Sequence, residues 1–116
     1  MDLELAALAE DVEAALTLQE HLADRVISRL TERTDMTLKQ SDLDSTDRVL
    51  ELIYEIKPGW SVSVRGTARQ PNGHWRCTLR QSSTKDNDEY LGVARGPTLP
   101  HALLAALLKA LSFSSS

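Results

Sequence analysis

The fold is decided by residues 58–65, which read Pro-Gly-Trp-Ser-Val-Ser-Val-Arg. Before this stretch apolar residues recur at helical spacing, and within it Trp60, Val62 and Val64 alternate with polar residues. Proline disfavours helix at the residue before it, and alternation with a period of two is typical of a strand with one buried face. The stretch therefore predicts that a helix ends at residue 57 and that a β-sheet begins at residue 60.

Two more strands are expected to follow. Residues 70–73, Gln-Pro-Asn-Gly, are typical of a hairpin turn because Asn-Gly favours positive φ. The second strand then begins near Trp75, and a third strand covers residues 90–95 after a polar loop. Alternation gives the sheet one apolar and one polar face. The predicted apolar face consists of Trp60, Val62, Val64, Trp75, Cys77, Leu79, Leu91 and Val93.

Helices are expected on both sides of these strands. Residues 45–57 carry apolar side chains at helical spacing, with Asp44 or Ser45 as the N-cap, and residues 99–111 form a second helix rich in leucine and alanine. Both helices should cover the apolar face of the sheet. Residues 45–111 are therefore expected to form an α-β-β-β-α core.

Residues 3–33 predict one long amphipathic N-terminal helix, which completes the order α-α-β-β-β-α in a single domain of α+β class over residues 1–116. Such a helix would extend about 45 Å, which is more than the 45–111 unit can cover. We therefore expect it to pack against a second copy of the chain in a homodimer. The predicted oligomer interface consists of Leu5, Leu8, Val12, Leu16, Leu22 and Val26.

The core region resembles the small α-β-β-β-α domains of the phage ABA sandwich family. The features that carry the resemblance are the helix that ends in residues 58–60, the strands over residues 75–79 and 91–93, and the Pro-Thr-Leu-Pro sequence at residues 97–100. The resemblance covers a little over half of the chain. It implies a fold, but it implies no activity and no functional residue.

The composition limits the classes of protein to which the chain can belong. The chain of 116 residues has one cysteine, Cys77, so it has no intramolecular disulfide. Its N-terminal residues are acidic, and its longest apolar stretch, residues 99–111, is too short to cross a bilayer. These features predict a soluble, cytoplasmic protein with no membrane partner. The net charge of −4 combines −8 over residues 1–58 with +4 over residues 59–116.

No sequence motif indicates catalysis or a cofactor. Cys77 alternates with apolar residues and is expected to be a buried, unreactive thiol. The histidines, His21, His74 and His101, lack the spacing of a metal site and are expected to be solvated. We therefore expect no enzymatic activity and no cofactor.

The polar face of the predicted sheet gathers basic side chains. Arginine and an aromatic residue on an open sheet can bind single-stranded nucleic acid. Three interpretations stay open: a solvated face, a face covered by the acidic first helix of the same or another chain, and a nucleic-acid surface. The residues of this face are Arg65, Arg69, His74, Arg76 and Arg80, with Tyr90 on the third strand.

These observations predict a small non-enzymatic accessory module that acts through protein interaction and associates with itself through its N-terminal helix. The alternative is a nucleic-acid-binding module that uses the arginine-rich sheet face.

Overall fold

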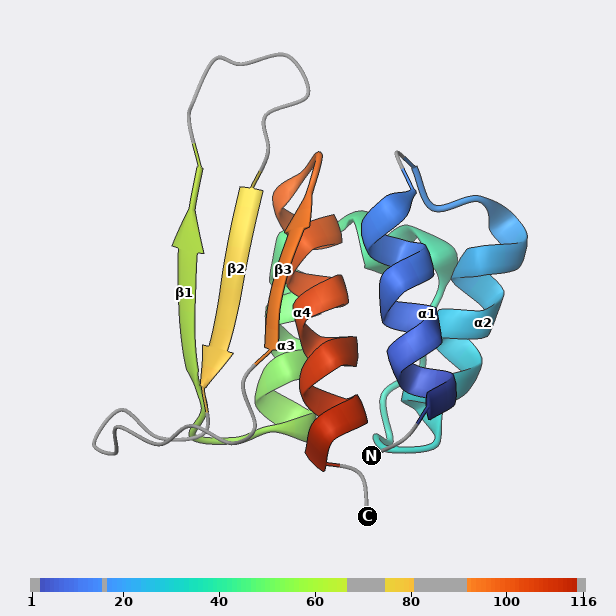
Figure 1. The fold of residues 1–116 in the computed structure, drawn as a ribbon. Coiled ribbons are helices and arrows are strands. Elements are labelled where there is room, and N and C mark those ends of the chain that lie inside the picture. Colours follow the sequence, from blue (N-terminus) through green and yellow to red (C-terminus); the bar gives the residue numbers. More distant parts are fainter. Residues whose placement is uncertain (1–2, 16, 67–74, 81–91, 115–116) are drawn as a thin grey trace.

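The computed structural model describes residues 3–15, 17–66, 75–80 and 92–114 (Figure 1). The three strands form one antiparallel sheet in the order β1-β2-β3, and helices pack on one of its faces. The predicted α+β class and sheet are confirmed. The elements in chain order are α1 (Leu3–Ala14), α2 (Glu20–Thr31), the 3-10 helix η1 (Gln40–Asp44), α3 (Thr46–Ile56), β1 (Ser61–Arg65), β2 (Trp75–Arg80), β3 (Gly92–Gly96) and α4 (Leu99–Ser114).

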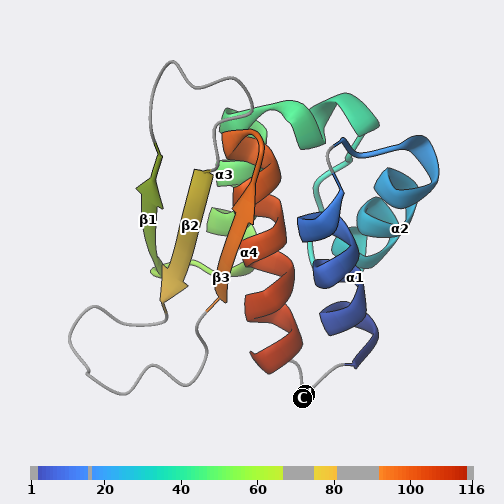
Figure 2. The same cartoon turned by 45° about the horizontal axis from the view of Figure 1, so that its top comes forward.

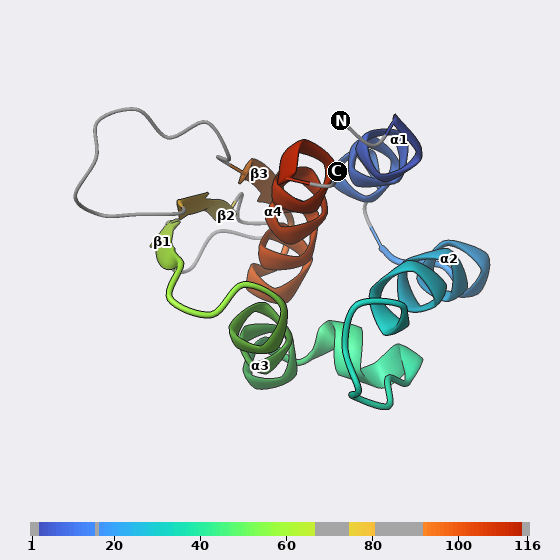
Figure 3. The same cartoon turned by 90° about the horizontal axis from the view of Figure 1, so that it is seen from below.

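Helix α4 forms the centre of the molecule. Its sequence is apolar on every side, and a helix of this kind is stable only when it is buried on every side. The structure satisfies this requirement, because α4 contacts β2, β3, α1, α3 and η1 (Figures 2 and 3). Its residues 102–108 and Ala110 are fully buried.

Helix α4 packs so closely on β3 that only small residues fit between them. A Cβ atom added at Gly92 would lie 2.2 Å from the Ala106 carbonyl oxygen, and one added at Gly96 would lie 2.7 Å from the Ala102 nitrogen. Ala94, between the two glycines, is 1% exposed. A Gly-x-Ala-x-Gly strand therefore faces a stripe of alanines on the helix, made of Ala102, Ala106 and Ala110.

This packing corrects the face that was predicted for Val93. The glycines and Ala94 face α4, whereas Val93 is half-buried on the helix-free side, where Arg95 is exposed. A strand shifted by one residue exchanges its two faces, and a β-branched side chain would be too large for the contact with α4. Leu91, which was predicted beside Val93, lies outside the described residues.

The N-terminal region forms two helices, so the prediction of one helix over residues 3–33 was wrong. A helix of that length would extend about 45 Å, whereas the longest dimension of the molecule is 35 Å. The chain leaves the helical conformation before Gln19, whose polar side chain interrupts the apolar stripe and whose extended backbone begins α2. Two short helices can each bury their apolar residues against the same core.

Strand β1 is less covered than predicted. Cys77 and Leu79 on β2 are fully buried, but Val62 is 37% exposed and Val64 is 44% exposed. The reason is that α3 packs against α4 and η1, while β1 contacts no described element other than β2. Trp60, whose ring lies 4.8 Å from the Lys57 ammonium, is half-buried, and so is Trp75.

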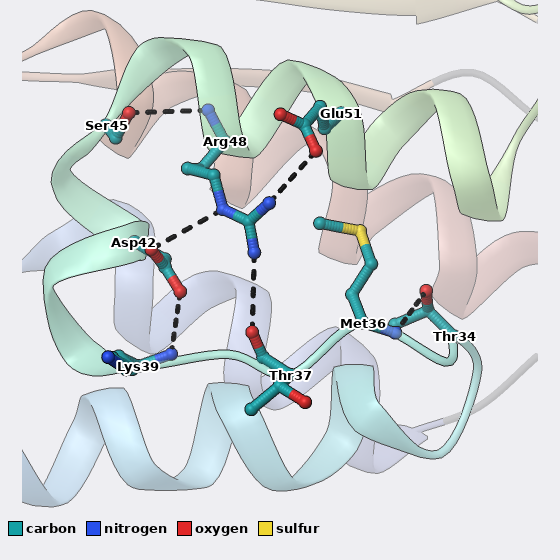
Figure 4. A network of polar contacts seen from close by, with 8 residues as sticks. All are labelled: Thr34, Met36, Thr37, Lys39, Asp42, Ser45, Arg48 and Glu51. Atoms are coloured by element: carbon teal, nitrogen blue, oxygen red, sulfur yellow. Dashed lines mark hydrogen bonds and ion pairs between the residues drawn. The ribbon is translucent and has the colours of Figure 1, made fainter.

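A network around Arg48 fixes the connection between α2 and α3 (Figure 4). The guanidinium binds Asp42 at 3.5 Å and Glu51 at 2.9 Å, and it donates to the Thr37 carbonyl at 3.3 Å. The Ser45 hydroxyl accepts from the Arg48 backbone N–H, which confirms Ser45 as the N-cap. The network holds α3 in the position from which it packs on α4.

We expect Gly92→Ala to lower the free energy of unfolding by about 2 kcal/mol or more, because the added methyl group collides with backbone of α4 that cannot move independently. The measurement is urea unfolding followed by circular dichroism. Val93→Ala, at the adjacent position on the other face, is the control and should cost less than about 1 kcal/mol. Equal costs for the two variants would contradict the close helix–strand contact.

Candidate functional site

Three arginines form a row across the helix-free face of the sheet. In the strand register Arg65 pairs with Arg76, and Arg76 pairs with Arg95. All three side chains are exposed. In the described structure no carboxylate forms a salt bridge with Arg65 or Arg76. Like charges directly opposite one another destabilise a sheet, so this arrangement does not serve stability.

Hydroxyl groups lie next to the arginine row. Ser63 pairs with Thr78, two residues further along the strands. An open hollow of about 360 Å³ is lined by Ser63, Arg65, Arg76 and Thr78 together with Val64. Arg80 pairs with Ser61 and is also exposed. Arginine and hydroxyl donors therefore share one flat surface.

The structure describes three of the six residues predicted for the basic face, and it adds Arg95 to them. Arg65, Arg76 and Arg80 lie on the helix-free face, whereas Arg69, His74 and Tyr90 are outside the described residues. Arg95 was missed because the third strand was assigned the opposite faces. The signal that could have revealed it is the Gly-x-Ala-x-Gly pattern, since small residues at alternate positions match an alanine-rich helix.

The acidic N-terminal helices do not cover this face. Helices α1 and α2 lie on the far side of α4 from the sheet, and α1 reaches only the edge of β3 (Figure 3). This arrangement excludes the interpretation in which the first helix of the same chain covers the arginines. The solvated face, a face covered by another chain and the nucleic-acid surface stay open.

The outer edge of β3 is closed by two side chains. The Glu13 carboxylate accepts from the Arg95 backbone N–H at 2.8 Å, and the Lys109 ammonium donates to the Val93 carbonyl at 2.9 Å. Glu13 and Lys109 also bind each other at 2.7 Å. Burial raises the pKa of Glu13, but the hydrogen bonds from Lys109 and the Arg95 backbone outweigh it, so this pKa lies below its usual value of 4.5.

The outer edge of β1 is open as far as the described residues go. Val93 and Arg95 direct their backbone groups away from β2, toward Lys109 and Glu13. Hydrogen-bonding directions alternate along antiparallel strands. Val93 pairs with Thr78 on β2, so the backbone groups of Thr78 point toward β1. Thr78 pairs with Ser63, so the backbone groups of Ser63 point toward β2 and those of Val62 and Val64 point outward. No described element covers these outward groups.

The residues of the predicted oligomer interface belong to the chain's own core. Leu5, Leu8, Val12 and Val26 are buried inside the chain, Leu22 is half-buried against the core, and Leu16 lies outside the described residues. The four buried side chains are not available to a second copy, which corrects this part of the interface predicted from the sequence. Homodimer formation itself stays a prediction.

His101 is buried, so its predicted solvation was wrong. Its Nε2 atom bonds the Val12 carbonyl, which lies in the last turn of α1. The carbonyls of a last helical turn have no partner within the helix. The Val12 carbonyl accepts from the Ala15 N–H at 3.3 Å just past the end of α1, and His101 adds a second hydrogen bond from α4. His21 is exposed on α2, and His74 lies outside the described residues.

The rest of the described structure shows no candidate metal site and only open hollows. No group of three or more histidine, cysteine, aspartate or glutamate side chains there could hold a metal ion. Two open hollows of about 480 and 580 Å³ lie along α1 and α2, and both arginines that line them form ion pairs, Arg25 with Asp11 at 3.2 Å and Arg29 with Glu4. Among the described helices none is both long and apolar enough to cross a membrane.

The sequence matches no protein-family model, and comparisons with curated proteins and with solved structures find no match. The resemblance to the phage ABA sandwich family stays a prediction. The features of the described structure that bear on function are the arginine row, the closed β3 edge and the open β1 edge.

We expect Glu13→Gln to destabilise the protein in a pH-dependent way. Because the folded-state pKa of Glu13 is lowered, the stability from its ionised form is present above about pH 4.5 and is lost as the pH falls through the folded-state value. The substitution should therefore lower the free energy of unfolding by about 1 kcal/mol at pH 7 and by less at pH 3. Urea unfolding at both pH values tests this, with Glu10→Gln, at an exposed position of α1, as the control.

The Cys77 thiol should react slowly in the native protein. The side chain is fully buried, and burial raises its pKa to about 11, so little thiolate exists at pH 8. We expect labelling with a thiol reagent to become fast only after denaturation in urea. Rapid labelling of the native protein at pH 8 would show that the β2 contact with α4 opens easily.

Proposed function

We propose that this protein is a non-enzymatic interaction module that pairs with a second copy of itself through strand β1. The supporting observation is the contrast between the two sheet edges. Glu13 and Lys109 bind the outward backbone groups of β3, whereas those of Val62 and Val64 on β1 have no cover in the described structure. An uncovered strand edge is a template for pairing with another chain.

The side chains of β1 favour pairing. Proteins that keep an edge strand single usually place lysine, proline, a bulge or an inward-pointing charge on it. Strand β1 reads Ser-Val-Ser-Val-Arg and has only a terminal arginine, which points to the helix-free side. The apolar side chains of Val62 and Val64 are on the opposite side, where they are more than a third exposed.

The sequence of β1 is complementary to itself in one antiparallel register. Centred on Ser63, this register pairs all five residues: Val62 with Val64 of the partner, and Ser61 with Arg65 of the partner. It uses the outward backbone groups of Val62 and Val64, and it puts these valines side by side on the helix-bearing face. No two arginines are directly opposite across the new edge. A two-fold dimer with a six-stranded sheet results.

A cysteine at position 63 tests this register. Ser63 would face its own copy in a pair without mutual hydrogen bonds, where the Cα atoms are about 4.5 Å apart, and this separation permits a disulfide. We expect Ser63→Cys to form a covalent dimer under mild oxidation, seen on a non-reducing gel. Ser41→Cys, at an exposed position of η1, is the control, and the buried native Cys77 should not interfere.

A proline at position 64 tests the pairing without a cross-link. The Val64 N–H points away from β2, so Val64→Pro should keep the fold, as judged by circular dichroism, and should abolish the dimer. Val64→Thr keeps the N–H and should still dimerise. The measurement is molar mass by light scattering over rising protein concentration. The proposal fails if the unmodified protein stays monomeric, or if Ser63→Cys and Ser41→Cys cross-link equally.

A further inference from the structure

The arginine row lies on the face of the sheet opposite to the helices and does not depend on the proposed dimer. Adjacent strands are about 4.8 Å apart, so Arg65, Arg76 and Arg95 present three guanidinium groups in a line of about 10 Å at the backbone. The three charges lie in one row although neighbouring charges repel one another. An anionic ligand that lies across the three strands would remove this repulsion.

We propose that this face binds the phosphate backbone of single-stranded nucleic acid. The four basic residues that the structure places on the sheet, Arg65, Arg76, Arg80 and Arg95, are all arginines. A guanidinium donates two parallel hydrogen bonds to a phosphate, whereas an ammonium acts as a point charge. The hydroxyls of Ser63 and Thr78 beside the row add donors for the same phosphate oxygens.

The shape of the surface favours a strand over a small anion. The hollow at Arg65 and Arg76 is open to solvent, so a single phosphate there would stay partly hydrated. A linear polyanion gains a contact at each strand that it crosses. The surface is flat, and no described helix projects from it toward the groove of a duplex. Val93 is the one apolar side chain placed on this face in the described strands, so binding depends on phosphate contacts more than on base stacking.

Binding should be strongly dependent on salt because it depends on charge. It should also be weak because the whole chain carries a net charge of −4. Each phosphate contact on a single strand contributes about −0.7 to the slope of log K against log salt concentration. Three arginines therefore predict a slope of about −2. The sequence of the bases should have little influence, since phosphate contacts carry no sequence information.

The test measures binding of the full-length protein to a fluorescein-labelled single strand of twenty thymidines by anisotropy at several salt concentrations. The double variant Arg65→Gln/Arg76→Gln should bind at least tenfold more weakly at low salt, with a slope reduced to about −0.7. The control Arg25→Gln/Lys39→Gln changes the net charge equally at exposed positions outside the sheet and should leave the slope at about −2. Circular dichroism establishes that both variants fold.

Three competitors decide the chemical class of the ligand. Unlabelled single strand should displace the probe, whereas poly-glutamate of equal charge should displace it at least tenfold less effectively. Equal displacement by poly-glutamate would show that the face takes acidic protein segments and would overturn the assignment, as would equal displacement by a duplex. Absence of binding at low salt, or the same loss in the control variant, would overturn it as well.

Discussion

The contact between α4 and β3 is the constraint on which the rest of the structure depends. Gly92 and Gly96 bring the strand backbone to the surface of the helix, and a single added methyl group at either position would lie less than 3 Å from helix backbone atoms. A contact this close allows one register and one face. It therefore makes Val93 and Arg95 point away from the helix. In this way it also determines which residues of β3 lie on the helix-free face.

The same contact explains why the two edges of the sheet differ. Helix α4 lies over β3 and β2, so its other sides are free for α1 and α3. Helix α1 then stands beside the outer edge of β3, where Glu13 and Lys109 can bind its backbone groups. Helix α4 packs directly on two of the three strands, β2 and β3. Strand β1 projects beyond α4, and its valines are left partly exposed.

The parts of the fold that depend on local spacing could be predicted from the sequence. The alternation in residues 60–65 and 75–80 identified two strands, and Ser45 was an expected N-cap. Properties that depend on distant partners could not be predicted. The apolar stripe of residues 3–33, interrupted only at Gln19, did not reveal that the molecule is too short for one helix, and the burial of His101 depends on the Val12 carbonyl on another helix. Arg95 was missed because its face is set by the contact with α4, to which the Gly-x-Ala-x-Gly pattern points but the strand propensity of Val93 does not.

Strand β1 contributes to both proposed surfaces, with Val62 and Val64 on one face and Arg65 on the other. In the self-complementary register, Arg65 of one copy is opposite Ser61 of its partner, and that serine is paired within its own sheet with Arg80. The arginine row of each copy would thus extend onto the partner's sheet without placing two guanidinium groups directly opposite. Dimerisation through apolar and backbone contacts is little affected by moderate salt, whereas phosphate binding falls steeply with it. Measurements of molar mass and of nucleic-acid binding at several salt concentrations therefore distinguish the two surfaces, although they share one strand.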